Sequence, residues 1–317
     1  MSVDIIITTY NAAKIISACL KSVKAQTYTD WTCYVIDDAS TDGTVALIRK
    51  DFSWVKLLVR EKNSGPSINR NIAIDAGNGE MIAVLDSDVV LDKHWLREQV
   101  TFMDAHLDCG IVGSKLVYYD NPKKLNARAG GLYTFGIGFD DGRGKPVSTF
   151  KKPLQCIYAC SAALLMRREI VATIGGFDET YFYGHEDTDL GWRANIAGYS
   201  VWSNPLALAK HRVSETMKNF SWRIYYHARK NYIRSVIKNY SWWNVLWALP
   251  MLVTFLLADL CVKGPRWAKL KGILWNIWHL PSTLIMRYKV QKTRKVSDLK
   301  LRRLFTKLSF EALFKRG

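Results

Sequence analysis

The chain has 317 residues and a formal net charge of +17, with 49% hydrophobic and 23% charged residues. This length and composition allow a buried α/β core and exclude a disordered chain. The positive charge is concentrated at one end, because residues 263–317 hold fifteen lysines and arginines but only two acidic residues, a surplus of +13. The rest of the chain is close to neutral for its length, so the basic tail is the part that needs an anionic partner.

Apolar, β-rich segments alternate with amphipathic segments in the first third of the chain. Strands are predicted over residues 3–9, 33–37, 55–59 and 81–85. Helices are predicted between and after them. Their expected inward-facing residues are, in chain order, Ile15, Ile16, Cys19, Leu20 and Val23; Val45, Leu47 and Ile48; Ile68, Ile72 and Ala76; and Leu96, Val100 and Met103. Asn11 is the expected N-cap of the first helix. The alternation predicts a doubly wound, mainly parallel sheet with right-handed crossovers.

The pattern changes after residue 117. Residues 118–152 are rich in Gly, Asp, Lys and Asn, and the regular pattern then resumes with apolar, helical and extended segments. The later elements are expected at residues 157–166, 188–197, 200–202 and 219–240, the last as a basic, aromatic, amphipathic helix. We therefore expect a first domain over residues 1–215, in two halves that meet near residue 117, and a helical C-terminal region over residues 216–317.

Two apolar, Trp-containing segments lie in the C-terminal region. Residues 242–262 carry a single full charge, Asp259, and are long enough to span a membrane, whereas residues 272–286 are short for it. The flanks of the first segment are basic on both sides: Arg234, Lys238, Lys263 and Arg266. Because a single crossing conflicts with the positive-inside bias, we expect a shallow helical hairpin or helices lying in the interface. A buried helix of a soluble domain is the remaining alternative.

The two ends of the chain bear on its location in the cell. Residues 1–7 lack the basic segment and the length of a secretory signal, and the six cysteines have no C-x-x-C spacing. We expect a catalytic part on the cytoplasmic face of the cell membrane, held to an anionic membrane surface by the tail. Because tryptophans are interleaved with the basic residues, lipid is favoured and no nucleic-acid partner is expected.

Polar residues stand at the ends of the predicted strands. Asn11, Asp38, Asn63, Asp86 and Asp88 each fall at or just after such an end. In an open parallel sheet these ends share one edge, where ligands bind, so the side chains should converge. The carboxylates of Asp86 and Asp88 can hold Mg²⁺ or Mn²⁺ beside a diphosphate.

Two further carboxylate-rich segments have both a structural and a functional interpretation. In residues 37–44, Thr41 and Asp42 are expected to cap the next helix, while Asp38 is placed to bind a nucleobase or ribose. The carboxylates of Glu186 and Asp187 can stabilise the first turn of a helix through its dipole. The same dipole keeps a carboxylate ionised, as a general base requires.

The order of these segments is similar to that of the family 2 glycosyltransferases of GT-A fold. The resemblance covers residues 3–212 and is carried by residues 5–11, 37–44, 63–65 with 69–71, 86–88 and 184–187. Residues 129–131 and 175–179 most resemble rhamnosyltransferase-type members that build bacterial surface polysaccharides. By this resemblance, residues 1–117 form the nucleotide-sugar half and residues 118–215 the acceptor half of a GT-A catalytic domain.

The resemblance also implies residue roles. The residues implied at the nucleotide are Thr9, Asn11, Asp38, Asn63, Arg70, Asp86 and Ser87. Asp88 is implied as the metal ligand, with Asp86 and His211 completing the shell, and Asp187 as the catalytic base with Glu186 beside it. Asn69 stands where the family usually has Ala. The Q-x-x-R-W motif of processive members is absent from residues 222–230, which implies transfer of one or a few sugars.

The sequence thus predicts a metal-dependent, inverting hexosyl or deoxyhexosyl transferase. Its donor is a nucleotide-diphosphate sugar with UDP, dTDP or GDP, and its expected acceptor is a polyprenyl-diphosphate-linked or other lipid-linked saccharide. Truncation before Trp242 is expected to release the protein from membranes. The alternatives are a nucleotidyltransferase and a non-catalytic, membrane-tethered nucleic-acid-binding module. A dinucleotide oxidoreductase is disfavoured because the first strand is not followed by G-x-G-x-x-G.

Overall fold

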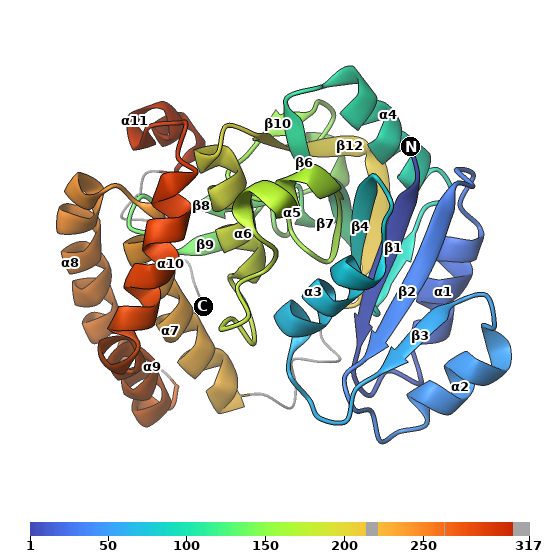
Figure 1. The fold of residues 1–317 in the computed structure, drawn as a ribbon, viewed down its shortest axis with the longest axis horizontal. Helices are drawn as coiled ribbons and strands as arrows, with labels where there is room; N and C mark the ends of the chain where they lie inside the picture. Colours follow the sequence, from blue (N-terminus) through green and yellow to red (C-terminus); the bar gives the residue numbers. More distant parts are fainter. Residues whose placement is uncertain (214–220, 263, 307–317) are drawn as a thin grey trace.

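The computed structural model describes residues 1–213, 221–262 and 264–306, and Figure 1 shows how its elements are arranged. The strands are β1 Val3–Thr9, β2 Trp31–Asp37, β3 Lys56–Val59, β4 Met81–Asp86, β5 Val89–Leu91, β6 Cys109–Tyr118, β7 Leu125–Ala127, β8 Ala129–Leu132, β9 Gly138–Asp141, β10 Leu154–Gln155, β11 Ala163–Arg167 and β12 Ser200–His211. The main sheet has the order β10-β12-β6-β11-β4-β1-β2-β3, with β5 on β12 and β7 on β6. Strands β8 and β9 form a separate hairpin.

The predicted parallel part of the sheet is confirmed. Strands β3, β2, β1 and β4 lie side by side and parallel; the apolar residues of β1 and β4 are almost fully buried, whereas the edge strand β3 is half-buried and exposes Val59. The register pairs Thr9 with Asp37 and Thr8 with Asp86, so the carboxyl ends of β1, β2 and β4 lie at one edge. The polar residues that follow these strands therefore start from neighbouring positions.

The other half of the sheet differs from a simple doubly wound pattern. Strand β11 is antiparallel to both of its neighbours, β4 and β6, whereas β12 is parallel to β6. The strand expected at residues 200–202 is the start of β12, which has twelve residues. Its far end pairs antiparallel with β5, next to residues 86–88.

The helices of the first half are α1 Ile16–Lys24, α2 Thr44–Asp51, α3 Pro66–Ala76 and α4 Trp95–Ala105. The inward faces predicted for the first and last of these are confirmed. The prediction that Asn11 caps α1 is wrong, because α1 begins five residues later and Asn11 has φ +50°. The predicted inward face of α3 is also wrong: its buried residues are Ser67, Asn69, Arg70, Ala73 and Ile74.

The remaining helices are α5 Arg168–Ile174, α6 Glu186–Ile196, α7 Ser221–Asn239, α8 Trp242–Asp259, α9 Arg266–Trp278, α10 Leu280–Lys292 and α11 Asp298–Leu301. Short 3₁₀ turns, η1 Val147–Thr149 and η3 Arg302–Leu304, complete the described elements. Helices α7 to α10 form a layer beside the sheet, at the left of Figure 1, with α6 between them and the sheet. Residues 219–220 of the predicted amphipathic helix, Lys263 of the predicted basic flank and residues 307–317 of the basic tail lie outside the described residues.

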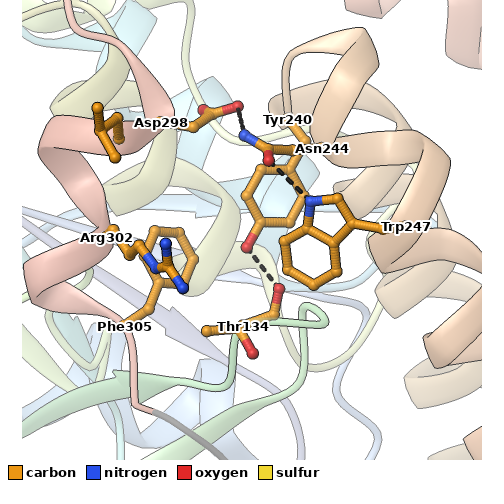
Figure 2. A pocket seen from close by; sticks show the side chains of 8 residues that line it. Thr134, Tyr240, Asn244, Trp247, Asp298, Arg302 and Phe305 are labelled. Atoms are coloured by element: carbon orange, nitrogen blue, oxygen red, sulfur yellow. Dashed lines mark hydrogen bonds between the residues drawn. The ribbon is translucent and has the colours of Figure 1, made fainter.

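The C-terminal layer shares a hydrophobic core with the first domain. One buried cluster contains Leu132 and Trp192 of the first domain together with Val236, Ala248 and Leu252 of the layer. Figure 2 shows the edge of this contact, where Tyr240 Oη donates a hydrogen bond to the carbonyl of Thr134 at 2.6 Å. The boundary expected near residue 215 therefore does not separate two independent cores.

The outer side of helix α8 is apolar. Helix α8 is the described helix that is long and apolar enough to cross a membrane, yet it buries Val245, Ala248, Leu252 and Leu256 against α7 and the core. Its outer side exposes Trp243 and Leu246. The apolar segment expected at residues 272–286 is divided between α9 and α10, which meet at His279.

Candidate active site

The loops after β1 and β2 are joined by side chains that follow the strand ends. Asn11 Oδ1 accepts a hydrogen bond from the Thr41 N–H at 2.8 Å, and the Asn11 N–H donates to Ser40 Oγ at 2.8 Å. Asp42 caps the start of α2 by accepting from the N–H and hydroxyl of Thr44. The N-cap residue of α2 is Gly43, so Asp42 stabilises the helix start from the position before the cap, and the predicted capping role of Thr41 is wrong, because Thr41 and Asn11 fasten one loop to the other.

Asp38 fastens the same edge to the loop before α3. Its two carboxylate oxygens accept the N–H groups of Ser64 and Gly65 at 2.7 and 2.9 Å. Since a carboxylate has further lone pairs, a nucleotide contact at Asp38 stays a prediction. Asn63 is exposed beside this loop.

Thr9 and Ser87 complete the predicted nucleotide residues. Thr9 Oγ1 is buried and has no hydrogen-bond partner among the described residues, as is true of Asp37 Oδ2 beside it. Ser87 is partly exposed between the two acidic residues. Unpaired buried oxygens at the edge of a sheet are open to a ligand, so the nucleotide roles of these residues stay predictions.

The structure brings Asp86, Asp88 and His211 together from distant parts of the chain. One ligand atom from each lies within 4.8 Å of the others. The pairing of β12 with β5 sets His211 beside Val89, and His211 Nε2 lies 3.4 Å from Asp88 Oδ1. Two carboxylates and one imidazole are a donor set that Mn²⁺ accepts, with open positions for substrate oxygens.

The surroundings of this cluster fit a divalent cation. His211 Nδ1 lies 2.9 Å from Asn126 Oδ1, so an imidazole proton at Nδ1 leaves the Nε2 lone pair facing Asp88. Asp88 Oδ1 is buried and accepts no hydrogen bond within the described part of the chain. Burial lowers the pKa of His211, but the carboxylates of Asp88 and Asp86 more than reverse this and raise it. A cation between these groups satisfies both atoms.

Arg70 lies behind the carboxylates and is almost completely buried. Its guanidinium donates to Asp86 Oδ1 at 2.8 Å and to Glu186 Oε1 at 3.0 Å. Burial raises the pKa of Asp86, and Asp88 adds to this, while Arg70 opposes it. These two buried contacts orient the carboxylates of Asp86 and Glu186. Arg70 can bind the nucleotide, as predicted, only if one of these contacts breaks.

Asp187 stands in the first turn of α6, with part of its surface exposed. Its carboxylate accepts hydrogen bonds from the N–H groups of Thr188 at 2.7 Å and Ser161 at 3.3 Å. Burial and the neighbouring charge of Glu186 outweigh these bonds and raise the pKa of Asp187 to about 7. A carboxylate with this pKa can take a proton at neutral pH and still be ionised in much of the population.

A cavity of about 930 Å³ connects the acidic groups. Its lining includes Asp86, Glu186, Asp187 and His211 of the predicted site. The predicted site residues did not include Tyr133, Phe139, Asp140, Arg143, Tyr158, Tyr183, His185 and Tyr232, which also line the cavity. Two signals were available: the Gly- and Asp-rich composition of residues 118–152, which contain the β8–β9 hairpin, and the segment 184–187, which contains His185.

His185 lies at the entrance to α6 in an unusual backbone conformation. It has φ +73°, one of three non-glycine residues with positive φ, together with Asn11 and Ala39, in the described chain. Burial lowers the pKa of His185 to about 3, so its imidazole is neutral at pH 7. His185 lines the cavity, and Asn11 and Ala39 each lie two residues after a strand end, at the edge of the sheet where the nucleotide is predicted to bind.

The fold and the site define a GT-A-like glycosyltransferase. Residues 4–175, more than half of the chain, match the family described as glycosyl transferase family 2. The chain therefore belongs to this family.

Two curated relatives illustrate the sequence similarity. The poly(ribitol-phosphate) β-N-acetylglucosaminyltransferase TarS of Staphylococcus aureus is 35% identical over 111 residues, 33% of this chain and 19% of TarS. WfgD of Escherichia coli, a UDP-Glc:α-D-GlcNAc-diphosphoundecaprenol β-1,3-glucosyltransferase, is 39% identical over 102 residues, 32% of this chain and 40% of WfgD. The chain thus spans less than half the length of these relatives.

Solved structures share the fold over most of the chain. The crystal structure of S. aureus TarS matches with a TM-score of 0.60 and 19% identity over 92% of this chain and 55% of that one. GalNAc-T7 with UDP, GalNAc and Mn²⁺ matches with a TM-score of 0.64 and 15% identity over 87% and 54%. A mannosyltransferase from Pyrobaculum calidifontis with GDP-Man and Mn²⁺ gives 0.54 and 18% over 92% and 85%.

Proposed function

We propose that this glycosyltransferase moves one sugar, with inversion, from a nucleotide-diphosphate sugar to a lipid-linked saccharide in cell-surface glycan synthesis. The observation that carries the proposal is that one cavity is lined by Asp187, with a pKa near 7, together with Asp86 and His211. A proton acceptor and a cation-binding cluster are the two parts that this reaction requires.

The reaction is a single displacement. Asp187 takes the proton of the acceptor hydroxyl, the acceptor oxygen bonds to the anomeric carbon, and the bond from that carbon to the diphosphate oxygen breaks with both electrons leaving on the oxygen. No covalent intermediate on the protein is needed, so the configuration inverts. Glu186 and Arg70 hold the acidic groups in place through their ion pair.

Asp88, Asp86 and His211 are the residues that would hold the metal. Mg²⁺ or Mn²⁺ bound there would neutralise the negative charge that develops on the leaving diphosphate. The GDP-Man and UDP complexes of the structurally similar transferases with Mn²⁺ support a metal of this kind. The proposed donor is a UDP-, dTDP- or GDP-sugar. The likeness to rhamnosyltransferases stays a prediction.

A lipid-linked acceptor fits the exposed surface of the C-terminal layer. Trp243 on α8, Trp278 on α9 and Tyr288 on α10 are each at least 70% exposed. Aromatic residues on a basic surface anchor a protein at an anionic interface. WfgD, whose acceptor is a diphosphoundecaprenol-linked sugar, supports this class of acceptor. We place the enzyme on the cytoplasmic face of the membrane, with α8 in the interface because one side of it is packed on α7.

The test is transfer assayed with UDP-, dTDP- and GDP-sugars, each with Mn²⁺, Mg²⁺ or EDTA, and a polyprenyl-diphosphate-linked sugar as acceptor. The proposal predicts a glycosylated lipid product of inverted configuration with one of the donors, and loss of product in EDTA. Release of diphosphate from a nucleoside triphosphate and a sugar phosphate would instead indicate the nucleotidyltransferase alternative. Binding of oligonucleotides in place of vesicles would favour the nucleic-acid-binding module.

A further inference from the structure

Helix α7 lines the cavity with one face and contacts α8, α9 and α10 of the C-terminal layer, which lie beside it in Figure 1. Ile224, Ala228 and Tyr232, spaced four residues apart on one face, line the cavity. On another side, Asn276 of α9 donates to the carbonyl of Lys230 and Arg287 of α10 donates to that of Tyr240. The helix is therefore in contact with both the candidate active site and the outer layer.

The loop that leads into the catalytic base is bound to α7 by side chains. Asn231 Nδ2 donates to the carbonyls of Tyr183 at 3.0 Å and Gly184 at 2.6 Å. Ser235 Oγ and Tyr181 Oη lie 2.7 Å apart, within hydrogen-bond distance. The two carbonyls held by Asn231 directly precede His185, whose positive φ turns the chain into α6. Because this turn is strained, external bonds are needed to maintain it.

The residue on the other side of the catalytic base is also bound to α7. Asp189, two positions after Asp187, accepts Lys238 Nζ at 2.8 Å and Asn239 Nδ2 at 3.0 Å. The carboxylate of Asp189 is completely buried, so these contacts are shielded from water. Side chains of α7 and its end therefore bind residues on both sides of Asp187 in the sequence, Gly184 before it and Asp189 after it.

The β8–β9 hairpin, which also lines the cavity, rests on the end of the same helix. Figure 2 shows the bond from Tyr240, directly after α7, to the carbonyl of Thr134 in the tip of the β8–β9 hairpin. Gly136 in this tip lies so close to Val236 that a Cβ there would come within 2.2 Å of Val236 Cγ2. The hairpin in turn contributes Tyr133 to the cavity.

We propose that α7 is the positioning element of this active site, and that Asn231 and Asn239 are positioning residues that hold the catalytic base, Asp187, in the cavity that the β8–β9 hairpin also lines. This inference rests on the proposed function, since it assigns the base to Asp187. The side-chain oxygens of Asn231 and Asn239 are buried and have no partner within residues 1–213, 221–262 and 264–306. An unpaired buried oxygen is unfavourable, so stability of the helix packing does not by itself explain an amide at these positions. The N–H groups of the two amides explain their presence, because they bind the backbone before His185 and the carboxylate of Asp189.

The test compares Asn231→Leu with Asn276→Leu. Asn276 is a matched control because it is also a buried asparagine that donates to backbone carbonyls and leaves its oxygen unpaired, but it approaches α7 from α9. Asn231→Leu is expected to lower kcat at least tenfold with little change in the donor KM. Asn276→Leu is expected to retain kcat, although both variants lose stability.

The pH dependence of kcat is the second measurement. The pKa of Asp187 is raised by burial and by the charges of Glu186 and Asp140, and is lowered by the N–H groups of Thr188 and Ser161. If Asn231→Leu loosens the turn and admits water, the acidic limb of the profile moves to lower pH, because the carboxylate ionises more readily. Asn276→Leu should leave this limb in place.

Hydrogen exchange of the same proteins provides a measurement that does not depend on activity. Faster exchange confined to residues 180–189 in Asn231→Leu is expected. If that variant does not fold, Asn239→Ala is measured in the same way. A folded variant of either residue with wild-type kcat, pH profile and exchange overturns the positioning role. Absence of transfer by the wild-type protein with every donor contradicts the proposed function instead.

Discussion

At the scale of single residues, Asp187 is the group on which the chemistry depends. Replacing it with Asn keeps the shape of the side chain but removes the proton acceptor. We expect Asp187→Asn to lower turnover by about 10²–10⁴-fold, the usual contribution of a general base, with donor affinity nearly unchanged. Initial rates and calorimetric donor binding measure the two effects. Turnover within a few fold of the wild type would remove Asp187 from this role.

The raised pKa of Asp187 gives the rate a specific pH dependence. A general base is active when ionised, so kcat should fall as the pH decreases through about 7, the pKa of this carboxyl group. Below that pH, the rate is expected to drop tenfold per unit. The profile of Asp187→Asn should be flat in the same range. A wild-type rate that stays constant from pH 8 to pH 5 would contradict the assignment.

His211 is expected to act through the metal. His211→Gln should weaken Mn²⁺ binding by about 10–100-fold, a typical cost of disturbing a metal shell. His106→Gln is the matched control, because His106 is also a partly buried histidine whose Nδ1 contacts a carbonyl, that of Phe102. Calorimetric titration with Mn²⁺ in the presence of nucleoside diphosphate measures both. Equal affinities for the two variants would exclude His211 as a ligand.

At the scale of elements, periodicity predicts strands better than it predicts the buried face of a mixed helix. The inward face of α1 follows its apolar residues, but α3 turns Arg70 inward and leaves Ile68 and Ile72 only partly buried. The reason is the ion pair of Arg70 with Asp86 and Glu186. A partner more than a hundred residues away, as Glu186 is, gives no local signal in the sequence around α3.

The antiparallel strand β11 and the far end of β12 were not predictable for a similar reason. A buried strand such as residues 163–167 has the same apolar sequence pattern whether its neighbouring strands are parallel or antiparallel. Yet the placement of β12 beside β5 brings His211 to Asp88. The carboxylates at the strand ends were predictable because ligands generally bind at this edge of a parallel sheet, whereas the other residues that line the cavity depend on irregular loops.

The exposed tryptophans of the outer helices provide a test of membrane binding that leaves the core intact. Trp243 and Trp278 are 81% and 76% exposed. Replacing both with Ser should lower partition to anionic vesicles about tenfold or more, because apolar area leaves the interface. Leu107 and Leu206, which are 83% and 68% exposed in the first domain, serve as controls when both are replaced with Ser. Equal partition of the two double variants would argue against the outer helices as the anchor.

At the scale of the whole molecule, the C-terminal layer is part of the folded domain. The buried face of α8 packs in the same cluster as Trp192 of α6 and Leu132 of the hairpin. The expectation that truncation before Trp242 cleanly releases the protein from membranes therefore has a structural obstacle. Removing the layer exposes the core that supports the base-bearing helix, so loss of membrane binding in such a protein would not identify the anchor.

The shared core makes a prediction about truncation itself. A chain ending at Ser241 lacks the buried residues of α8 and the contact of Asp298 with the Ser241 N–H, and leaves Trp192 with less cover. We expect it to be aggregated or partly unfolded, without a cooperative thermal transition. Leu252→Ala in the full chain should lower the free energy of unfolding by about 2–5 kcal/mol, since Leu252 is completely buried.

The midpoint of thermal unfolding of the full chain shows whether the protein unfolds as one cooperative unit or as two. If the layer and the first domain share one core, Leu252→Ala lowers the midpoint seen by circular dichroism and the midpoint at which nucleotide binding is lost by the same amount. Leu246→Ala, on the exposed side of α8, should leave both unchanged. A truncated chain that is soluble, unfolds cooperatively and binds the donor would contradict the single core, and the membrane anchor could then be separated from catalysis by deletion alone.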